Sequence, residues 1–353
     1  MTNPKSSSVT INGHGGMKNR KNISNYSSFW SNDSSKEKEE EEARKSQYMN
    51  MVNGYYDGVT ELYEYGWGQC FHFSRYYKGE PFAQGLARHE HYLAAKIGIT
   101  RNMRVLDVGS GVGGPAREIC HFTGANIVGV NNNLFQIDRA RKYAAKVGLA
   151  DKVTFEQADF TQMSSKFGEN AFDAVFSIEA TCHAPVAESV YGEVFKVLKP
   201  GCIFGFYEWC LTDKYNDDDS FHRRIRREIE LGDALPELRT IERAAEALRA
   251  VGFEIIESDD LATRDDLVPW YYPIRGKMSD AQTLWDYFTM FRLTTLGKGI
   301  TSTVVKAMEL VGLAHPGTAE LDRSLNIAAK ALVQGGETGI FTPMNLFICR
   351  KPL

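Results

Sequence analysis

A glycine-dense segment between an apolar run and a helix start constrains this chain more than any other feature. Residues 105–115 read VLDVGSGVGGP. Glycines allow a tight turn and leave no side chain between the backbone and a ligand. Pro115 suits the first turn of a helix, where a missing N–H costs nothing. A strand, a glycine turn and a helix in this order predict a nucleotide-like ligand at the carboxyl end of a first parallel strand.

The position of the acidic residue separates two kinds of cofactor. Glycines 109, 111 and 114 also match the G-x-G-x-x-G fingerprint of dinucleotide sites. That fingerprint expects Asp or Glu about 20 residues later. Here the second predicted strand, 126–130, ends in three asparagines, and the acid instead precedes the turn at Asp107. An acid there can hold the ammonium of an amino-acid-like ligand, which favours S-adenosylmethionine over NAD.

Alternating strand and helix patterns predict an α/β fold. Five apolar runs separated by helical patterns indicate a parallel sheet with helices on both faces. About 80 residues separate the last two predicted strands, which is too long for a loop and predicts a helical insertion. The seven predicted strands are 104–108, 126–130, 153–157, 174–178, 202–207, 253–256 and 344–349.

The segments outside this sheet differ in character. Residues 1–35 are rich in polar residues and are predicted to be disordered, and the charge run 36–45 is predicted to be a solvated helix. Residues 55–77 hold nine aromatic residues interleaved with acids and a histidine, a pattern that fits either a core or a lined pocket. Segments 268–273 and 284–291 could line a hydrophobic ligand site, touch a membrane surface or form an ordinary helical core.

Composition excludes several classes of protein. The formal net charge of −4 gives no basic surface for nucleic acid. The six cysteines contain no C-x-x-C pair, which indicates reduced thiols in a cytosolic setting and no metal site. No run approaches the ~20 apolar residues of a membrane-spanning helix, and the N-terminal residues lack the pattern of a secretory signal.

Several segments together resemble the sterol 24-C-methyltransferases, which are class I S-adenosylmethionine-dependent enzymes. The resemblance extends from about residue 48 to the end, and one departure is Ser110, where the family usually has Cys. It implies a Rossmann-like sheet with helices on both faces, an N-terminal aromatic cap and a C-terminal helical insertion before the last strand. The matching segments are 63–73, 106–115, 178–185, 207–215, 229–236 and 350–352.

The resemblance also divides the chain and implies a reaction. It gives a tail and charged lead-in (1–47), an aromatic substrate cap (48–100), a cofactor-binding domain (101–230) and a sterol methyltransferase C-terminal region (231–353). The implied reaction transfers a methyl group from S-adenosylmethionine to carbon 24 of an unsaturated sterol side chain. A carbocation forms, a hydride shifts, and loss of a proton leaves a methylene group.

This chemistry needs aromatic faces for the cation and a base for the proton. Tyr65 is the first aromatic candidate, followed by Trp67, Phe71 and Phe73. Glu179 is the first candidate for an electrostatic or base role, because it follows the fourth strand at the edge where ligands bind. The other base candidates are Glu64, His72 and His183, and both histidines could instead be hydrogen-bonded structural residues. Glu208 could bind the sterol hydroxyl or cap a helix.

Candidate cofactor residues follow three strands. The methionine part is expected at Asp107, Gly109, Ser110, Gly111 and Gly113, with Ser110 contributing mainly backbone. Asn131 and Asn132 would meet the ribose hydroxyls, and Asp159 would reach the adenine amino group with Phe160 beside it.

Partners and location come from the resemblance alone. It implies a sterol substrate and a homo-oligomer in peripheral contact with the cytosolic face of the endoplasmic reticulum or a lipid droplet. Two other functions stay open: a class I methyltransferase acting on another lipid or small molecule, and a non-catalytic sterol or cofactor carrier.

Overall fold

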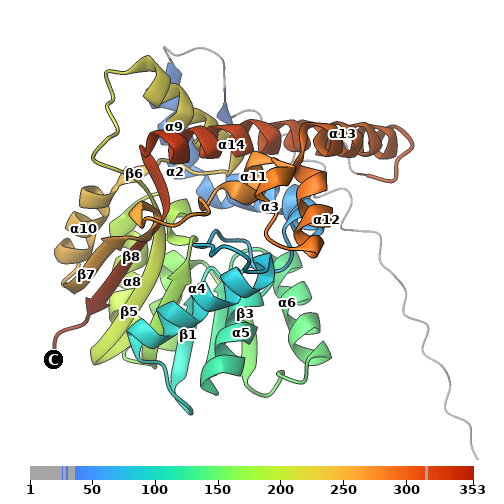
Figure 1. Cartoon of the computed structure of the whole chain (residues 1–353). Helices are drawn as coiled ribbons and strands as arrows, with labels where there is room; N and C mark the ends of the chain where they lie inside the picture. The colour runs from blue at the N-terminus through green and yellow to red at the C-terminus, as the bar shows by residue number, and fades with distance from the viewer. Residues whose placement is uncertain (1–25, 27–28, 31–35, 315–316) are drawn as a thin grey trace, which may run out of the picture.

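The computed structural model describes residues 26, 29–30, 36–314 and 317–353 (Figure 1). The predicted disorder of the first 35 residues otherwise lies outside the described part. Tyr26 and Phe29 are buried, and the Tyr26 ring lies 5.6 Å from that of Tyr55. The prediction of disorder is therefore wrong for these two residues.

A single sheet confirms the predicted α/β class. Its strand order is β3-β2-β1-β4-β5-β8-β7, and the two-residue β6 (Arg239–Thr240) pairs with β5. The first five strands are parallel to one another, whereas β8 pairs antiparallel with both β5 and β7. The main strands are β1 (Arg104–Val108), β2 (Asn126–Asn131), β3 (Val153–Gln157), β4 (Phe172–Ile178), β5 (Leu198–Leu211), β7 (Glu254–Asp260) and β8 (Phe341–Arg350).

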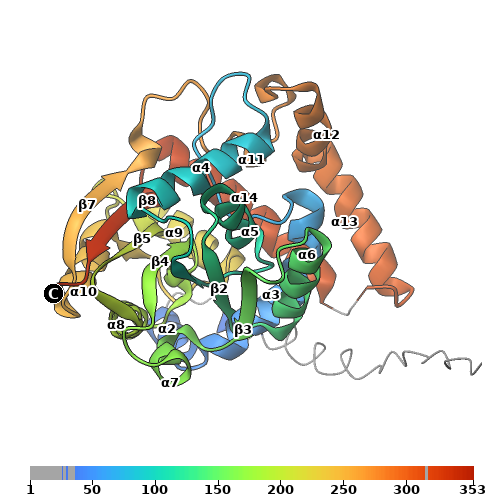
Figure 2. The ribbon, with the colours of Figure 1, turned by 90° about the horizontal axis from the view of Figure 1, so that it is seen from below.

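Helices cover both faces of this sheet, as the alternation of apolar side chains along each strand requires. Val105 and Leu106 are neighbours in β1 but belong to different core clusters. The first cluster includes α4 (Phe82–Ile97), α5 (Gly114–Thr123) and α6 (Leu134–Lys146), and the second includes α8 (Ala187–Val197) and α10 (Ile241–Ala250). Figure 2 shows α4 and α8 on opposite sides of the strands.

A layer of helices lies across the carboxyl ends of the strands (Figure 1). The predicted helical insertion between β7 and β8 is confirmed, and its longest helix packs against α9 (Ser220–Gly232) and α3 (Tyr48–Gly66). This layer encloses the edge of the sheet where the glycine turn ends. The inserted helices are α11 (Tyr272–Arg275), α12 (Leu284–Leu293), α13 (Thr295–Leu310) and α14 (Thr318–Thr338).

The charged segment near the N-terminus is packed where the sequence predicted a solvated helix. Arg44 in α2 (Glu37–Ser46) is buried, donates from Nε to the Pro236 carbonyl at 3.1 Å and lies 3.8 Å from Glu230. On the same helix, Glu40 accepts from Arg227 at 3.1 Å. Ion pairs replace the missing apolar face, so the prediction of a solvated helix is wrong for this side of α2.

Candidate active site

The glycine turn after β1 is held against β2. The backbone N–H groups of Gly109 and Ser110 both donate to the Val130 carbonyl at 2.9 Å. Gly109 has a φ of +82°, and a Cβ there would lie 2.3 Å from the Cβ of Ala180. Gly113 has a φ of +77°, and a Cβ there would lie 2.4 Å from the Phe155 ring. Gly113 therefore meets the core, whereas the sequence had placed it against the ligand.

A cavity lies directly over this turn, and we name it the cofactor pocket. Of the predicted cofactor residues, Gly109, Ser110, Gly111, Asn131, Asn132 and Phe160 line it. It also contains residues that the sequence analysis did not single out, because they come from α3 and the loop after it. These additional residues include Tyr48, Val52, Tyr56 and Gln69.

Asp107 is buried beneath the turn, and its environment fits a cationic ligand group. Its Oδ2 has no hydrogen-bond partner within the described part of the chain. Burial and the nearby Glu90 raise the pKa of Asp107 well above its usual range, and His72 opposes this shift. A buried carboxylate without a partner is costly, and an ammonium group would relieve that cost. Asp107 is not among the residues that line the cofactor pocket, but Gly109 and Ser110 close to it in sequence are, so an unpartnered carboxyl at this position fits the amino-acid part of S-adenosylmethionine.

Asp159 does not line the cofactor pocket, although its neighbours do. Its Oδ1 accepts from the Tyr48 hydroxyl at 2.5 Å and from the Thr161 backbone N–H at 2.8 Å. The Tyr48 ring stacks on Phe160 with centroids 6.3 Å apart. Asp159 therefore holds the side of the pocket together in this structure, and its predicted contact with adenine stays a prediction.

A second cavity opens between the sheet edge and the inserted helices, and we name it the apolar pocket. The space between its wall atoms is ≈ 940 Å³, including the part that is open to solvent. Much of its wall is aliphatic and comes from helices remote in sequence from the glycine turn. These wall residues include Leu62, Leu235, Ile274, Leu293, Leu325, Ala328, Ala329 and Leu332.

The two pockets meet, and the residues shared by both walls define the junction. They are Tyr56, Phe71, His72, Glu179 and His183. The junction thus brings together three of the predicted base candidates. Trp67 and Phe73, two of the aromatic candidates, line the apolar pocket close by.

Glu179 is fixed at the junction by two donors. Its Oε1 accepts from the Phe73 backbone N–H at 2.8 Å, and its Oε2 accepts from Trp209 Nε1 at 2.7 Å. Its backbone has a φ of +53°, which is uncommon outside glycine and holds the side chain at the sheet edge. Burial raises its pKa to about 7, while His72 and the two donors oppose that shift. Glu179 can therefore supply negative charge to both pockets.

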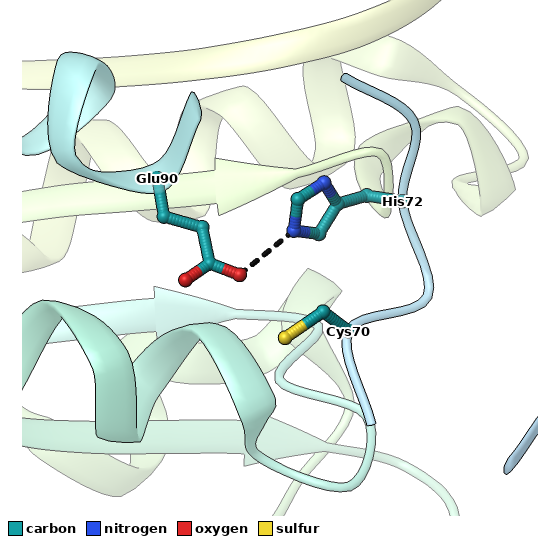
Figure 3. Close-up of side chains that lie close together, drawn as sticks. All are labelled: Cys70, His72 and Glu90. Atoms are coloured by element: carbon teal, nitrogen blue, oxygen red, sulfur yellow. Dashed lines mark hydrogen bonds and ion pairs between the residues drawn. The ribbon is translucent and has the colours of Figure 1, made fainter. Parts of the chain in front are cut away.

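The buried residues His72 and Glu90 form a cluster with the half-buried Cys70 (Figure 3). Its Nε2 lies 2.8 Å from Glu90 Oε1, and its Nδ1 donates to the Phe73 carbonyl at 2.7 Å. Burial alone would lower the pKa of His72, but the hydrogen bond and charge of Glu90 outweigh it and raise the pKa. Cys70, His72 and Glu90 lie close enough to bind a metal ion, but both imidazole nitrogens already make hydrogen bonds. We therefore interpret His72–Glu90 as an ion pair that orients the junction.

His183 has the hydrogen bonds of a structural histidine, one of the two roles left open by the sequence. Its Nδ1 donates to the Ala234 carbonyl at 3.1 Å, so its Nε2 accepts from the Tyr56 hydroxyl at 3.0 Å. Burial lowers its pKa to about 4, with Ala234 opposing the shift. The ring is neutral near pH 7, and its lone pair is already used.

The structure brings neither Glu64 nor Tyr65 into either pocket. Glu64 forms an ion pair with Arg139 and accepts from the Tyr143 hydroxyl at 2.5 Å. Tyr65 is 54% exposed and lies beneath Arg292. Tyr65 lies in the last turn of α3, which ends at Gly66. Successive helical residues are rotated by about 100°, so Tyr63 faces the apolar pocket while Tyr65 faces solvent.

Glu208 is also structural. It is buried and accepts from the Thr181 hydroxyl at 2.6 Å and the Tyr191 hydroxyl at 2.9 Å. It lines neither the cofactor pocket nor the apolar pocket. Neither of the two roles considered from the sequence describes these contacts, which join the sheet to the segment after β4.

The sheet and the cofactor pocket define a class I S-adenosylmethionine-dependent methyltransferase. The family model described as methyltransferase domain matches residues 99–249. The [4+2]-cyclase SpnF has the same fold, with a TM-score of 0.61 and 22% identity, covering 86% of this chain and 97% of the other. Geranyl diphosphate C-methyltransferase from Streptomyces coelicolor, solved with S-adenosyl-L-homocysteine, also has this fold. Its TM-score is 0.61 at 14% identity, and the match covers 86% of this chain and 97% of the other.

Sequence relatives define the family more narrowly. The model described as sterol methyltransferase C-terminal matches residues 288–353. The sterol 24-C-methyltransferase of Debaryomyces hansenii is 54% identical over 88% of this chain and 82% of its own length. The Schizosaccharomyces pombe enzyme is 51% identical over 94% and 88%. The chain belongs to the sterol 24-C-methyltransferase family, which confirms the predicted resemblance and S-adenosylmethionine as the cofactor.

Proposed function

We propose that this enzyme methylates carbon 24 of a sterol with an unsaturated side chain and produces a 24-methylene sterol. The observation that carries the proposal is the junction, where an apolar pocket opens onto the cofactor pocket. Sequence identity above 50% to sterol 24-C-methyltransferases supports the same reaction. When bound, the cofactor supplies an electrophilic methyl group.

The residues of this chain would hold the cofactor from below and from the side. Asp107 would pair with its ammonium, Gly109 and Gly111 would leave room for the methionine part, and Asn131 and Asn132 would meet the ribose. The unpartnered Oδ2 of Asp107 and the lining of the cofactor pocket support these roles.

The apolar pocket would hold the unsaturated side chain of the sterol away from water. An alkene is a weak nucleophile, so alignment and exclusion of water contribute much of the rate. Phe71, Trp67 and Phe73 would stabilise the cation through their ring faces, each contributing about 0.5–2 kcal/mol. Glu179 would add negative charge at the junction, and the His72–Glu90 pair would orient the adjoining loop.

We also propose that the enzyme reaches sterols at a membrane surface, as a homo-oligomer on the cytosolic face of the endoplasmic reticulum or a lipid droplet. None of the described helices is long and apolar enough to cross a membrane. Helices α12 and α13 lie side by side at one edge of the molecule (Figures 1 and 2). They expose large apolar side chains, which favour an interfacial contact. These are Leu284, Phe288, Phe291, Leu296, Ile300, Val304, Met308 and Leu310.

A product assay tests the reaction. The purified protein is incubated with labelled S-adenosylmethionine and a sterol with a double bond at carbon 24, and in parallel with the saturated sterol. Mass spectrometry is expected to find a 24-methylene product from the unsaturated sterol only. Absence of product with cofactor binding intact would assign the substrate to another lipid class. Equal labelling of both sterols would refute reaction at the double bond.

A further inference from the structure

Asp233 is a buried carboxylate in the wall of the apolar pocket that the roles above do not use. It follows α9 and is only 6% exposed. Its Oδ1 accepts from the Tyr63 hydroxyl at 3.2 Å, whereas its Oδ2 has no hydrogen-bond partner among the described residues. Buried polar atoms in native proteins are nearly always paired, so an unpaired carboxylate oxygen on a residue that lines a ligand pocket points to function.

Contacts of Asp233 and its neighbour place it at the reactive end of that pocket. The next residue, Ala234, accepts from His183 at 3.1 Å through its carbonyl. The ring of Tyr63 packs 5.2 Å from that of Phe71. His183 and Phe71 are both junction residues. Asp233 therefore lies near the junction, where the sterol side chain would meet the cofactor.

Glu179 is less suited to remove a proton than Asp233. Both oxygens of Glu179 already accept an N–H donor, so neither oxygen is without a hydrogen-bond partner. Asp233 has one donor, which leaves Oδ2 available. Burial raises the pKa of Asp233 to about 7, which is suitable for a base that works near neutral pH.

We propose that Oδ2 of Asp233 is the base that removes the final proton from the newly added methyl carbon, while the Tyr63 hydroxyl holds Oδ1 in place. In this step one C–H bond of the added carbon breaks. Its electron pair forms the double bond to the cationic carbon 24, and the proton passes to Oδ2. The sterol leaves neutral, and no oxidant or further reactant is needed. The proposal rests on the proposed function.

Tyr63, which hydrogen-bonds Asp233, is itself held by Tyr55. The Tyr55 hydroxyl donates to the Gly232 carbonyl at 2.7 Å, so it can accept from Tyr63 at 3.0 Å. Tyr63 thus shares its one proton between Tyr55 and Asp233, and its ring position is fixed from two sides. Tyr63 is a positioning residue, and Asp233 is the group that would touch the reacting atoms.

Substitution of Asp233→Asn tests the proposal, because it removes the base and keeps the shape and the acceptor for Tyr63. The yield of 24-methylene sterol per turnover is expected to fall by about 10²-fold or more. Methylated sterols with other fates, a side-chain alcohol or an isomeric alkene, are expected to replace it. Asp233→Glu should restore part of the 24-methylene yield, and Tyr63→Phe should lower the rate without changing the products.

Asp173→Asn is a matched control, because Asp173 lies at the amino end of β4, pairs with Lys199 at 2.5 Å and is remote from both pockets. Its products should match the wild type. An unchanged product distribution and rate in Asp233→Asn would overturn the proposal. A tenfold higher KM with unchanged products would also overturn the proposal, because it would indicate that Asp233 binds the substrate. Loss of all methylated sterol while the cofactor still binds would overturn it as well. Failure of the wild type to form 24-methylene sterol would instead refute the proposed function.

Discussion

Replacement of Asp107 by Asn is expected to change cofactor affinity strongly and the free energy of unfolding very little. Without a ligand, burial raises the pKa of Asp107 well above its usual range, so the folded protein can keep this group neutral. Asn has nearly the same shape and is also neutral. We therefore expect the free energy of unfolding of the cofactor-free protein to change by less than about 1 kcal/mol.

Cofactor binding should respond much more strongly. A hydrogen bond to a charged group contributes about 1.5–3 kcal/mol. Loss of that contribution weakens binding by roughly 10–150-fold, since about 1.4 kcal/mol is a factor of ten. Asp107→Ala should weaken binding further, because it also removes the side chain that fills the space beneath the turn.

Calorimetric titration with S-adenosylhomocysteine measures this loss, because that ligand keeps the amino-acid part. Methylthioadenosine is the matched ligand, since it keeps the nucleoside and lacks the ammonium. We expect its affinity to be the same for wild type and Asp107→Asn. Unchanged affinity for S-adenosylhomocysteine would refute the pairing of Asp107 with the ammonium. An equal loss for both ligands would attribute the effect to a distorted turn.

Three further variants test separate parts of the structure. Glu179→Gln should lower kcat/KM by about 10²-fold or more and make the rise in activity with pH near 7 less steep, because the ionisation of Glu179 is lost and that of Asp233 remains; an unchanged pH profile would contradict this. Leu296→Glu with Ile300→Glu should reduce flotation with phosphatidylcholine vesicles at least tenfold, since each buried apolar side chain contributes about 1.5–3 kcal/mol, while equal flotation would reject this membrane face. Gly113→Ala should destabilise the fold by about 1–3 kcal/mol through strain and the clash with Phe155, which thermal unfolding measures.

Local chemistry made the sheet and the cofactor turn predictable. The cofactor turn could be recognised from a short continuous segment, because it contains the glycines, the acid before them and Pro115 after them. Strand lengths did not follow in this way. The fifth strand was predicted over 202–207 but extends over Leu198–Leu211, because β8 and β6 pair with its last residues. These partners are remote in sequence, and no local pattern reveals them.

The candidate site was predictable only in part, for the same reason. Glu179 and His72 were found because each stands beside a recognisable strand end or aromatic segment. Asp233 lies 170 residues from Tyr63, and only the packing of α9 against α3 brings the two side chains together. Tyr65 was the first aromatic candidate and Tyr63 was not among the candidates, because the sequence alone did not show which face of α3 lines the apolar pocket.

The raised pKa values of Glu179 and Asp233 have a mechanistic consequence once both pockets are considered together. Each value is about 7 because burial penalises the charged carboxylate. A positive charge placed at the junction favours ionisation and lowers these values. A bound sulfonium would therefore help to ionise the carboxylates that the sterol cation later needs. Near pH 7 each of these carboxyl groups is therefore about half ionised in the empty pocket, and a cationic partner at the junction increases the ionised fraction.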